Sequence, residues 1–364
     1  MPEPLPTLWL CGPPGVGKST AGWELYAGLA DAGYVDIDQL GMCYPELASD
    51  PGRTLLEARI LGGVVAGFRA AGASCLVVSG YVDARRGVHT GYLAGAALSV
   101  LRLRCDQPEL RRRLELRARP GEQREPALRE AEVLDRSGLP YQCLDTTGRT
   151  AAEVLATVRG RWPAQPARRP GPWPHPTPTP GEILWVCGAT AVGKSTVGYE
   201  VAVASRRAGH TTGFVDLQQI GFRRPPPGHD PGNHRLKAAN LAAVWENFHA
   251  YGARRLVVVG QVDRAGDLQR YAEALPAAAM TLYRLHASPA RLCERIRQRA
   301  LGGGPQIAGD ELRGQPAAVL DRAYAAAVAQ SGALERAALG DTRVDSDGRT
   351  VDDLAREIAG RAGW

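Results

Sequence analysis

Apolar residues along this chain follow two alternating patterns. Short continuous runs such as LVVS (76–79) and LVVV (256–259) predict strands buried on both faces, as in parallel sheets. Longer stretches with apolar residues at helical spacing follow these runs and predict helices. Regular alternation of strand and helix predicts an α/β fold. The predicted strands are 7–11, 34–37, 75–79, 99–104, 141–144, 183–187, 213–217, 255–259, 280–285 and 342–344, and the predicted helices are 18–30, 53–71, 107–118, 150–159, 194–207, 234–250, 288–300, 309–331 and 350–360.

The pattern of the first half returns in the second half. YVDIDQLG (34–41) matches FVDLQQIG (214–221), and LVVSGYVD (76–83) matches LVVVGQVD (256–263), both at an offset of 180. LDTTGRT (144–150) matches VDSDGRT at an offset of 200. The second half therefore holds about twenty extra residues before its last strand, and the sequence predicts a tandem repeat.

A proline-rich segment separates the two halves. Eight prolines lie between Trp162 and Gly181. Proline at this density cannot form a helix or an interior strand and favours an extended, semi-rigid spacer. A docking site for a proline-binding partner is the alternative. We therefore predict two domains, 1–160 and 183–364, joined by a linker at 161–182, each a parallel sheet of about five strands covered by helices on both faces.

Composition narrows the class of protein. The 364 residues are 44% hydrophobic, as in globular proteins, and no run approaches the roughly 18 apolar residues that cross a bilayer. The first residues, MPEPLPT, lack the basic and apolar regions of a signal peptide. Seven cysteines occur singly, without the spacing of a zinc site. We expect a cytoplasmic protein with reduced thiols and no membrane contact.

One motif occurs in both halves directly after an apolar run. GPPGVGKS (12–19) and GATAVGKS (188–195) both match GxxxxGK[ST], and a helical pattern follows each. The chain has 44 lysines and arginines but three lysines in all, of which two occupy the motif's lysine position. Glycines in such a loop let successive backbone N–H groups face phosphate oxygens at a helix N-terminus. The motif therefore predicts nucleoside triphosphate binding in each half.

The motif assigns a role to each of its residues. Lys18 and Lys194 would reach the β- and γ-phosphates, and Ser19 and Ser195 would place a hydroxyl on Mg²⁺. ATP and Mg²⁺ are thus the expected cofactors. The residues expected to line the nucleotide are Gly12, Gly15, Val16, Gly17, Lys18, Ser19 and Thr20 in the first half, and Gly188, Ala191, Val192, Gly193, Lys194, Ser195 and Thr196 in the second.

Carboxylates occur at the end of the second predicted strand of each half. Asp36 and Asp38 are two residues apart, so both would point to one face of a strand. At its end they could hold Mg²⁺ and accept a proton from the acceptor hydroxyl; a helix cap is the alternative role. The second half keeps Asp216 but has Gln218 in place of the other carboxylate, and an amide cannot act as a base at neutral pH.

These motifs together resemble those of P-loop small-molecule kinases, such as shikimate, gluconate, adenylylsulfate and nucleoside monophosphate kinases. The resemblance covers most of both halves and rests on the GKST loops, VDID (35–38), the arginine-rich stretches 101–117 and 283–299, and the closing turns. It implies two kinase-like P-loop NTPase domains. It also implies that the arginine-rich helix leads into a lid whose arginines contact the phosphates. Arg113 and Arg117 match Arg295 and Arg299, lie one helical turn apart and could face the γ-phosphate together; a solvated surface position is the alternative for each.

The acceptor is not specified by these motifs. The glycine triplet of shikimate kinases and the DGFPR-like segment of adenylate kinases are replaced by GYVD and GQVD. The predicted acceptor helices differ in charge, with Arg53, Glu57 and Arg59 in the first half where the second has Asn233, Lys237 and Ala239. Different charges there imply different ligands, or one half without a substrate.

Three hypotheses for function follow. The first is an ATP-dependent phosphotransferase acting on a small hydroxyl- or phosphate-bearing acceptor, with catalysis better supported in the first half. The second is an ATP-binding regulatory or assembly protein with little turnover. The third, a polynucleotide-type kinase, rests on the net charge of +6. Because the arginines cluster where nucleotide phosphates would bind, nucleic acid is not the expected partner. Oligomeric state, base specificity and domain arrangement stay open.

Overall fold

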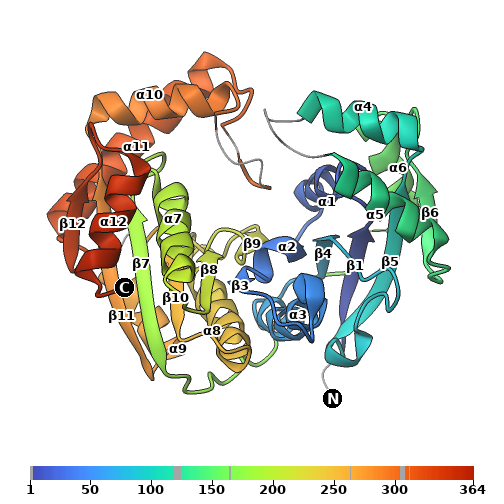
Figure 1. Cartoon of the computed structure of the whole chain (residues 1–364), viewed down its shortest axis with the longest axis horizontal. Helices are drawn as coiled ribbons and strands as arrows, with labels where there is room; N and C mark the ends of the chain where they lie inside the picture. Colours follow the sequence, from blue (N-terminus) through green and yellow to red (C-terminus); the bar gives the residue numbers. More distant parts are fainter. Residues whose placement is uncertain (1–2, 118–123, 164, 263, 304–307, 311) are drawn as a thin grey trace. The chain divides into compact units, whose positions relative to one another are not determined.

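The computed structural model describes two compact units (Figure 1). Unit 1 consists of Met1–Gly41, Leu47–Pro174 and Gly221–Leu236, and unit 2 of Met42–Glu46, His175–Ile220 and Lys237–Trp364. The residues described are 3–117, 124–163, 165–262, 264–303, 308–310 and 312–364, with Arg117 described by its backbone alone.

Unit 1 contains a six-stranded sheet with the order β6-β5-β1-β4-β2-β9. Its five N-terminal-half strands are parallel, and β9 joins β2 in the antiparallel direction. The parallel strands are nearly all apolar because both faces are covered. The strands are β1 Leu5–Cys11, β2 Ala32–Asp36, β4 Cys75–Gly80, β5 Ala96–Arg104, β6 Gln142–Asp145 and β9 Phe222–Arg224.

Helices cover both faces of this sheet. Neighbouring residues of a strand point to opposite faces. At Gly33 a Cβ would lie 2.5 Å from Phe68 of α3, whereas the next side chain, Tyr34, packs against Gly22 of α1. The helices are α1 Lys18–Ala27, α2 Ile37–Leu40, α3 Thr54–Ala70, α4 Gln107–Arg117, α5 Glu125–Arg136 and α6 Ala151–Arg161, with short 3₁₀ helices at Pro51–Arg53 and Thr90–Tyr92.

Unit 2 contains a sheet of the same order, β12-β11-β7-β10-β8-β3. Its five C-terminal-half strands are again parallel, and β3 joins β8 in the antiparallel direction. The strands are β7 Gly181–Gly188, β8 Thr212–Asp216, β10 Arg255–Val259, β11 Ala278–His286, β12 Thr342–Asp345 and β3 Cys43–Tyr44.

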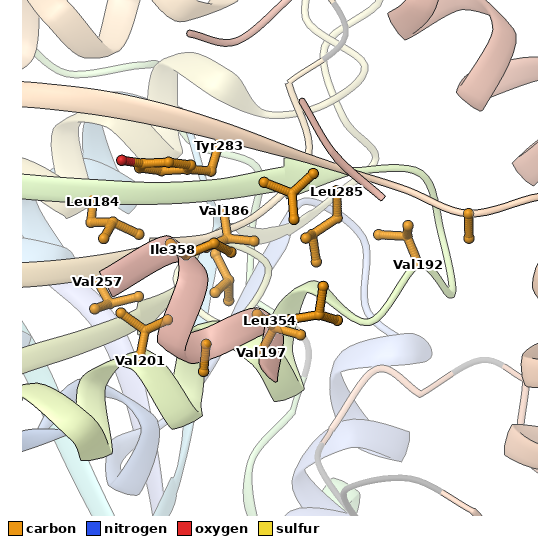
Figure 2. Packing of buried hydrophobic residues seen from close by; sticks show 14 of the residues in the cluster. Leu184, Val186, Val192, Val197, Val201, Val257, Tyr283, Leu285, Leu354 and Ile358 are labelled. Atoms are coloured by element: carbon orange, nitrogen blue, oxygen red, sulfur yellow. The ribbon is translucent and has the colours of Figure 1, made fainter. Parts of the chain in front are cut away.

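The core of unit 2 lies between its sheet and two packed helices. Leu184, Val186 and Val257 of the strands contact Val201 of α7 and Ile358 of α12 (Figure 2). The opposite face is covered too, because a Cβ at Gly213 would lie 2.4 Å from Phe248 of α8. The helices are α7 Lys194–Arg207, α8 His234–Ala250, α9 Ala265–Ala274, α10 Pro289–Ala300, α11 Ala317–Ala337 and α12 Val351–Arg361.

Each sheet takes its last strand from the other half of the sequence. In unit 1, Phe222 of β9 pairs with Tyr34, and its ring lies 4.8 Å from that of Trp23. In unit 2, Tyr44 of β3 pairs with Thr212, and the guanidinium of Arg206 lies 4.2 Å from the Tyr44 ring centre. Both exchanged strands therefore add side-chain packing to the backbone pairing.

This exchange corrects the linear domain boundaries expected from the sequence. Segments 42–46 and 221–236 each belong to the unit formed mainly by the other half, so 1–160 and 183–364 are not the units themselves. The proline-rich segment has no helix or strand between Arg161 and Gly181 in its described residues. It packs on the units: Gly171 donates to the Arg69 carbonyl, and Trp245 donates its Nε1–H to the Thr179 carbonyl.

Candidate functional site

The loop of unit 1 has the backbone that a phosphate-binding loop requires. Gly12, Gly15 and Gly17 have φ values of 141°, 84° and 103°, a region that favours glycine. A Cβ at Gly12 would lie 2.3 Å from the Leu103 carbonyl oxygen, so no other residue fits there. Val16 is buried beneath the loop, and α1 begins at Lys18 directly after it.

The loop of unit 2 repeats this conformation with one difference. Gly188 and Gly193 have φ values of 141° and 102°, and Val192 is buried. Ala191 stands where unit 1 has Gly15 and keeps a left-handed φ of 63°. Left-handed backbone costs an L-residue about 1–2 kcal/mol, so this alanine is held there by the rest of the loop.

The motif lysines and serines occupy matching positions. Lys18 donates from Nζ to the Pro13 carbonyl at 3.0 Å, and Lys194 donates to the Ala189 carbonyl at 2.8 Å. Each loop lysine thus folds over its own loop. Thr20 and Thr196, the third residue of α1 and of α7, have exposed side chains.

Each motif serine faces an aspartate at the end of a neighbouring strand. Ser19 donates from Oγ to Asp36 Oδ2 at 3.3 Å, and Ser195 donates to Asp216 Oδ2 at 2.8 Å. A hydroxyl and a carboxylate oxygen are the hard oxygen donors that Mg²⁺ prefers. The residues described hold no group of three or more His, Cys, Asp or Glu side chains that could bind a metal. These two pairs therefore fit a magnesium ion that is otherwise held by nucleotide phosphates and water.

Asp36 and Asp38 lie on different elements, which corrects the expectation that one strand holds both. β2 ends at Asp36, and Asp38 lies in the single turn of α2. Asp36 caps that helix, since its Oδ1 accepts a hydrogen bond from the Asp38 backbone N–H at 3.2 Å. The same cap recurs in unit 2, where Asp216 Oδ1 accepts from the Gln218 N–H at 3.0 Å.

Three carboxyl groups of unit 1, those of Asp36, Glu57 and Glu130, are poorly solvated, whereas Asp38 is exposed. Burial, and then the charge of Asp38, raise the pKa of Asp36 to about 7, against the opposing effect of Lys18. Burial likewise raises the pKa of Glu130 to about 7 and that of Glu57 well above its usual value. Burial lowers the pKa of Lys18, while Asp38, Glu130 and Asp36 oppose the change. One ammonium and four carboxyl groups therefore form an electrostatically linked cluster.

Glu130 is a site residue that the sequence analysis missed. It lies on α5, a helix that was not predicted. Its counterpart is Gln330 of α11, whose Oε1 accepts from the Thr190 backbone N–H of the phosphate loop at 2.9 Å. The offset of 200 that relates the closing turns also relates Glu130 to Gln330. Applying this offset to the sequence could therefore have identified the two residues as equivalent.

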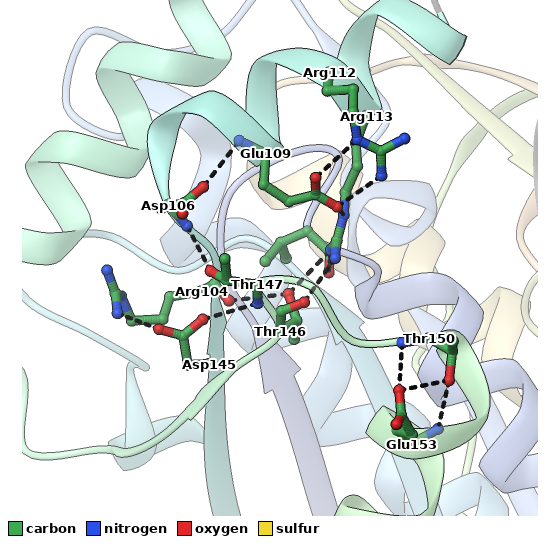
Figure 3. Close-up of polar contacts among 11 residues, drawn as sticks. Arg104, Asp106, Glu109, Arg112, Arg113, Asp145, Thr146, Thr147, Thr150 and Glu153 are labelled. Atoms are coloured by element: carbon green, nitrogen blue, oxygen red, sulfur yellow. Dashed lines mark hydrogen bonds and ion pairs between the residues drawn. The ribbon is translucent and has the colours of Figure 1, made fainter.

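Arg113 links the phosphate loop to the closing turn (Figure 3). Its guanidinium donates to the Val16 carbonyl at 3.3 Å and to Thr146 Oγ1 and the Thr146 carbonyl at 3.0 and 2.7 Å. Glu109 pairs with the same guanidinium at 2.7 Å.

Arg295 of unit 2 makes the equivalent connection, donating to the Val192 carbonyl at 2.6 Å and Ser346 Oγ at 3.2 Å. The two remaining arginines of the sequence prediction differ from this pair. Arg299 pairs with Asp310 at 2.9 Å. The side chain of Arg117 lies outside the described residues.

Solved structures similar to this chain include several kinases. A tunicamycin resistance protein from Deinococcus radiodurans is 19% identical, with 50% of this chain and 96% of that chain covered, at a TM-score of 0.34. The adenylylsulfate (APS) kinase of Mycobacterium tuberculosis, in complex with AMPPNP and APS, is 16% identical over 52% and 100% of the two chains, at 0.33. A gluconokinase from Sinorhizobium meliloti is 20% identical over 51% and 94%, at 0.31.

Other comparisons give no family for this chain. No protein-family model and no curated protein matches its sequence. Among the helices described, none is both long enough and apolar enough to cross a bilayer.

Proposed function

We propose that the chain is an ATP-dependent phosphotransferase and that unit 1 transfers the γ-phosphoryl group of ATP to a small hydroxyl- or phosphate-bearing molecule. The observation that carries this proposal is the placement of Lys18 and Ser19 on the phosphate loop opposite Asp36 and Asp38. The loop residues of the sequence analysis would hold the phosphates through their backbone N–H groups. ATP then supplies the phosphoryl group, and ADP leaves.

The reaction needs positioning and charge neutralisation more than covalent help. An acceptor oxygen forms a bond to the γ-phosphorus while the bond from that phosphorus to the β–γ bridging oxygen breaks. Lys18 would turn from the Pro13 carbonyl to the phosphates and balance charge on them. Mg²⁺, held by Ser19 and Asp36 together with phosphate oxygens, would neutralise the leaving ADP.

The carboxylate pair would receive the proton of an acceptor hydroxyl. Asp36 would be occupied by Mg²⁺ in the loaded site, so we assign the proton to Asp38, whose backbone N–H is held by Asp36.

Unit 2 supports nucleotide binding better than transfer. Its loop, Lys194, Ser195 and Asp216 match those of unit 1. Gln218 replaces the carboxylate to which we assign the proton. We infer that the two halves are a tandem pair of kinase-like units in which the second has a regulatory, nucleotide-binding role; their identical strand order supports the repeat.

Binding stoichiometry and turnover test this proposal. Calorimetry of the full chain with ATP and Mg²⁺ should give two sites, and Lys18→Ala and Lys194→Ala should each remove one. Acceptor-dependent ADP formation in the presence of a metabolite extract should be lost in Lys18→Ala and in Asp38→Asn but kept in Lys194→Ala. Turnover that survives Lys18→Ala while Lys194→Ala abolishes it would contradict the assignment to unit 1.

A further inference from the structure

Three carboxylates around the unit 1 loop have no acidic counterpart in unit 2. The offset of 180 relates Asp38 to Gln218 and Glu57 to Lys237, and the offset of 200 relates Glu130 to Gln330. Of these four carboxylates, Asp36 alone is matched by an acid, Asp216. The lysine and serine of the loop and the aspartate that faces the serine are the same in both units, whereas the three other carboxylates are not.

The helices that hold these residues occupy equivalent places. α3 and α8 both have 17 residues and start at the same point of the repeat. Arg102 pairs with Asp135 of α5 at 2.8 Å, and the equivalent Arg284 pairs with Glu335 of α11 at 2.9 Å. The residues compared between the two units therefore occupy equivalent positions in the fold.

Asp38 lies in α2, directly after β2, and Glu57 lies in α3 against Gly41, the residue that follows α2. Asp38 Oδ1 faces Gly80 at the end of β4, 3.3 Å from where a Cβ would stand. Glu57 Oε1 would lie 2.4 Å from a Cβ at Gly41, and the Glu57 side chain is only 3% exposed. The charge of Asp38 adds to the rise in the Glu57 pKa, and Arg53 opposes it. The Glu57 carboxyl group therefore lies within electrostatic range of Asp38.

Glu130 has a buried oxygen without a hydrogen-bond partner among the described residues. The reason lies in the loop sequence. Gln330 satisfies its oxygen with the Thr190 N–H, but the equivalent loop residue in unit 1 is Pro14, which has no N–H. An unsatisfied buried acceptor is costly, so this oxygen is available to a donor from a ligand.

Unit 2 has the opposite charge at the same place. Lys237 Nζ donates to Gln218 Oε1 at 3.3 Å, which puts an ammonium and an amide where unit 1 has two carboxylates. In unit 1 the nearby cations are Lys18 and Arg53.

We propose that unit 1 takes an acceptor that carries a protonated amine beside its phosphoryl-accepting hydroxyl, and that Glu57 and Glu130 select it. This inference rests on the proposed phosphotransferase activity. The amine would donate to Glu130 Oε1 and balance the charge of Glu57, and unit 2 would not share the preference.

Fractionated metabolites test the inference. A metabolite extract is separated by ion exchange into cationic, neutral and anionic fractions, and acceptor-dependent ADP formation by the full chain is measured with each. We expect activity in the cationic fraction. Loss of a charge-assisted hydrogen bond costs about 1.5–3 kcal/mol, so Glu130→Gln should raise the KM for that fraction about tenfold to hundredfold. Glu57→Lys, which copies unit 2, should have at least the same effect.

Controls separate this effect from damage to the fold. Glu132→Gln removes the same charge two residues away, at a side chain that is 48% exposed, and should leave KM unchanged. All variants should still bind two ATP. Activity in the neutral or anionic fraction would overturn the inference about the amine but not the proposed phosphotransferase function. A KM that is unchanged in Glu57→Lys and Glu130→Gln would do the same. No activity in any fraction would overturn the proposed phosphotransferase function along with it.

Discussion

Replacement of Arg113 by lysine separates two roles that this residue could play in nucleotide binding. The guanidinium joins three oxygens, those of Val16 and Thr146, and the side chain is 18% exposed. Val16 belongs to the phosphate loop and Thr146 to the turn after β6. Lysine keeps the positive charge but has a single nitrogen, which cannot reach all three oxygens at once. The substitution therefore loosens the loop without changing net charge.

The expected size of the effect follows from the lost hydrogen bonds. Each bond to a charged group contributes about 1.5–3 kcal/mol. Two such bonds would be lost, and we assign about half of their combined free energy to ordering the loop for its ligand. Nucleotide affinity in unit 1 should therefore fall by about tenfold to hundredfold. Because the loop cradles the α- and β-phosphates, which ADP also carries, ATP and ADP should weaken alike.

Calorimetric titration provides the measurement. Lys194→Ala is used as background so that only unit 1 binds, and ATP and ADP affinities are compared with and without Arg113→Lys. The neighbouring Arg112→Lys is the matched control, since that guanidinium pairs with Glu109 and its side chain is 60% exposed. A loss confined to ATP would show instead that Arg113 contacts the γ-phosphate, as the family resemblance implies, and would refute the role in ordering the loop.

Two further predictions concern stability. Ala191→Gly should stabilise unit 2 by about 1 kcal/mol, because glycine adopts the left-handed φ of 63° without strain. An unchanged or lower midpoint of urea unfolding would count against strain at this alanine. Asp36→Asn should remove a pH dependence of the wild type. The folded pKa of about 7 exceeds the unfolded 3.8, so the folded state binds the extra proton between these values and its free energy of unfolding falls as pH rises from 4 to 7. The difference should reach at most about 4 kcal/mol above pH 7, measured by urea unfolding across that range, and parallel wild-type and variant curves would contradict it.

The parallel strands and the phosphate loops were predictable because local sequence determines them. LVVS and LVVV lie within β4 and β10 as expected, and α1 and α7 begin at the motif lysines. The motif GxxxxGK[ST] identifies such a loop from eight adjacent residues. The structure gives the motif glycines positive φ values and buries the valine, as such a loop requires. The aspartate facing each motif serine was also predictable from its place after the second strand.

Features that depend on distant residues could not be predicted in the same way. β3 and β9 have two and three residues, too few for a hydrophobic pattern, and each pairs with a strand of the other half. α5 is a different case, because its sequence, EPALREAEVLDR, has the buried residues Leu128, Ala131 and Leu134 at helical spacing, so this helix was missed although its pattern is local. The end of β2 at Asp36 was missed because the Asp36 side chain caps α2. This side-chain hydrogen bond competes with the hydrogen bonds of the strand, and the alternation of apolar and polar residues does not reveal it.

The reciprocal placement of β3 and β9 constrains how this protein can change over generations. If the second half lost its nucleotide chemistry entirely, the chain would still need Phe222–Arg224 to cover the edge of β2 in the first half. A bare edge strand is prone to pair with other chains and aggregate. Deleting the second half would thus expose this edge of the first half. The fold of each half therefore depends on a strand of the other, whatever ligand either of them binds.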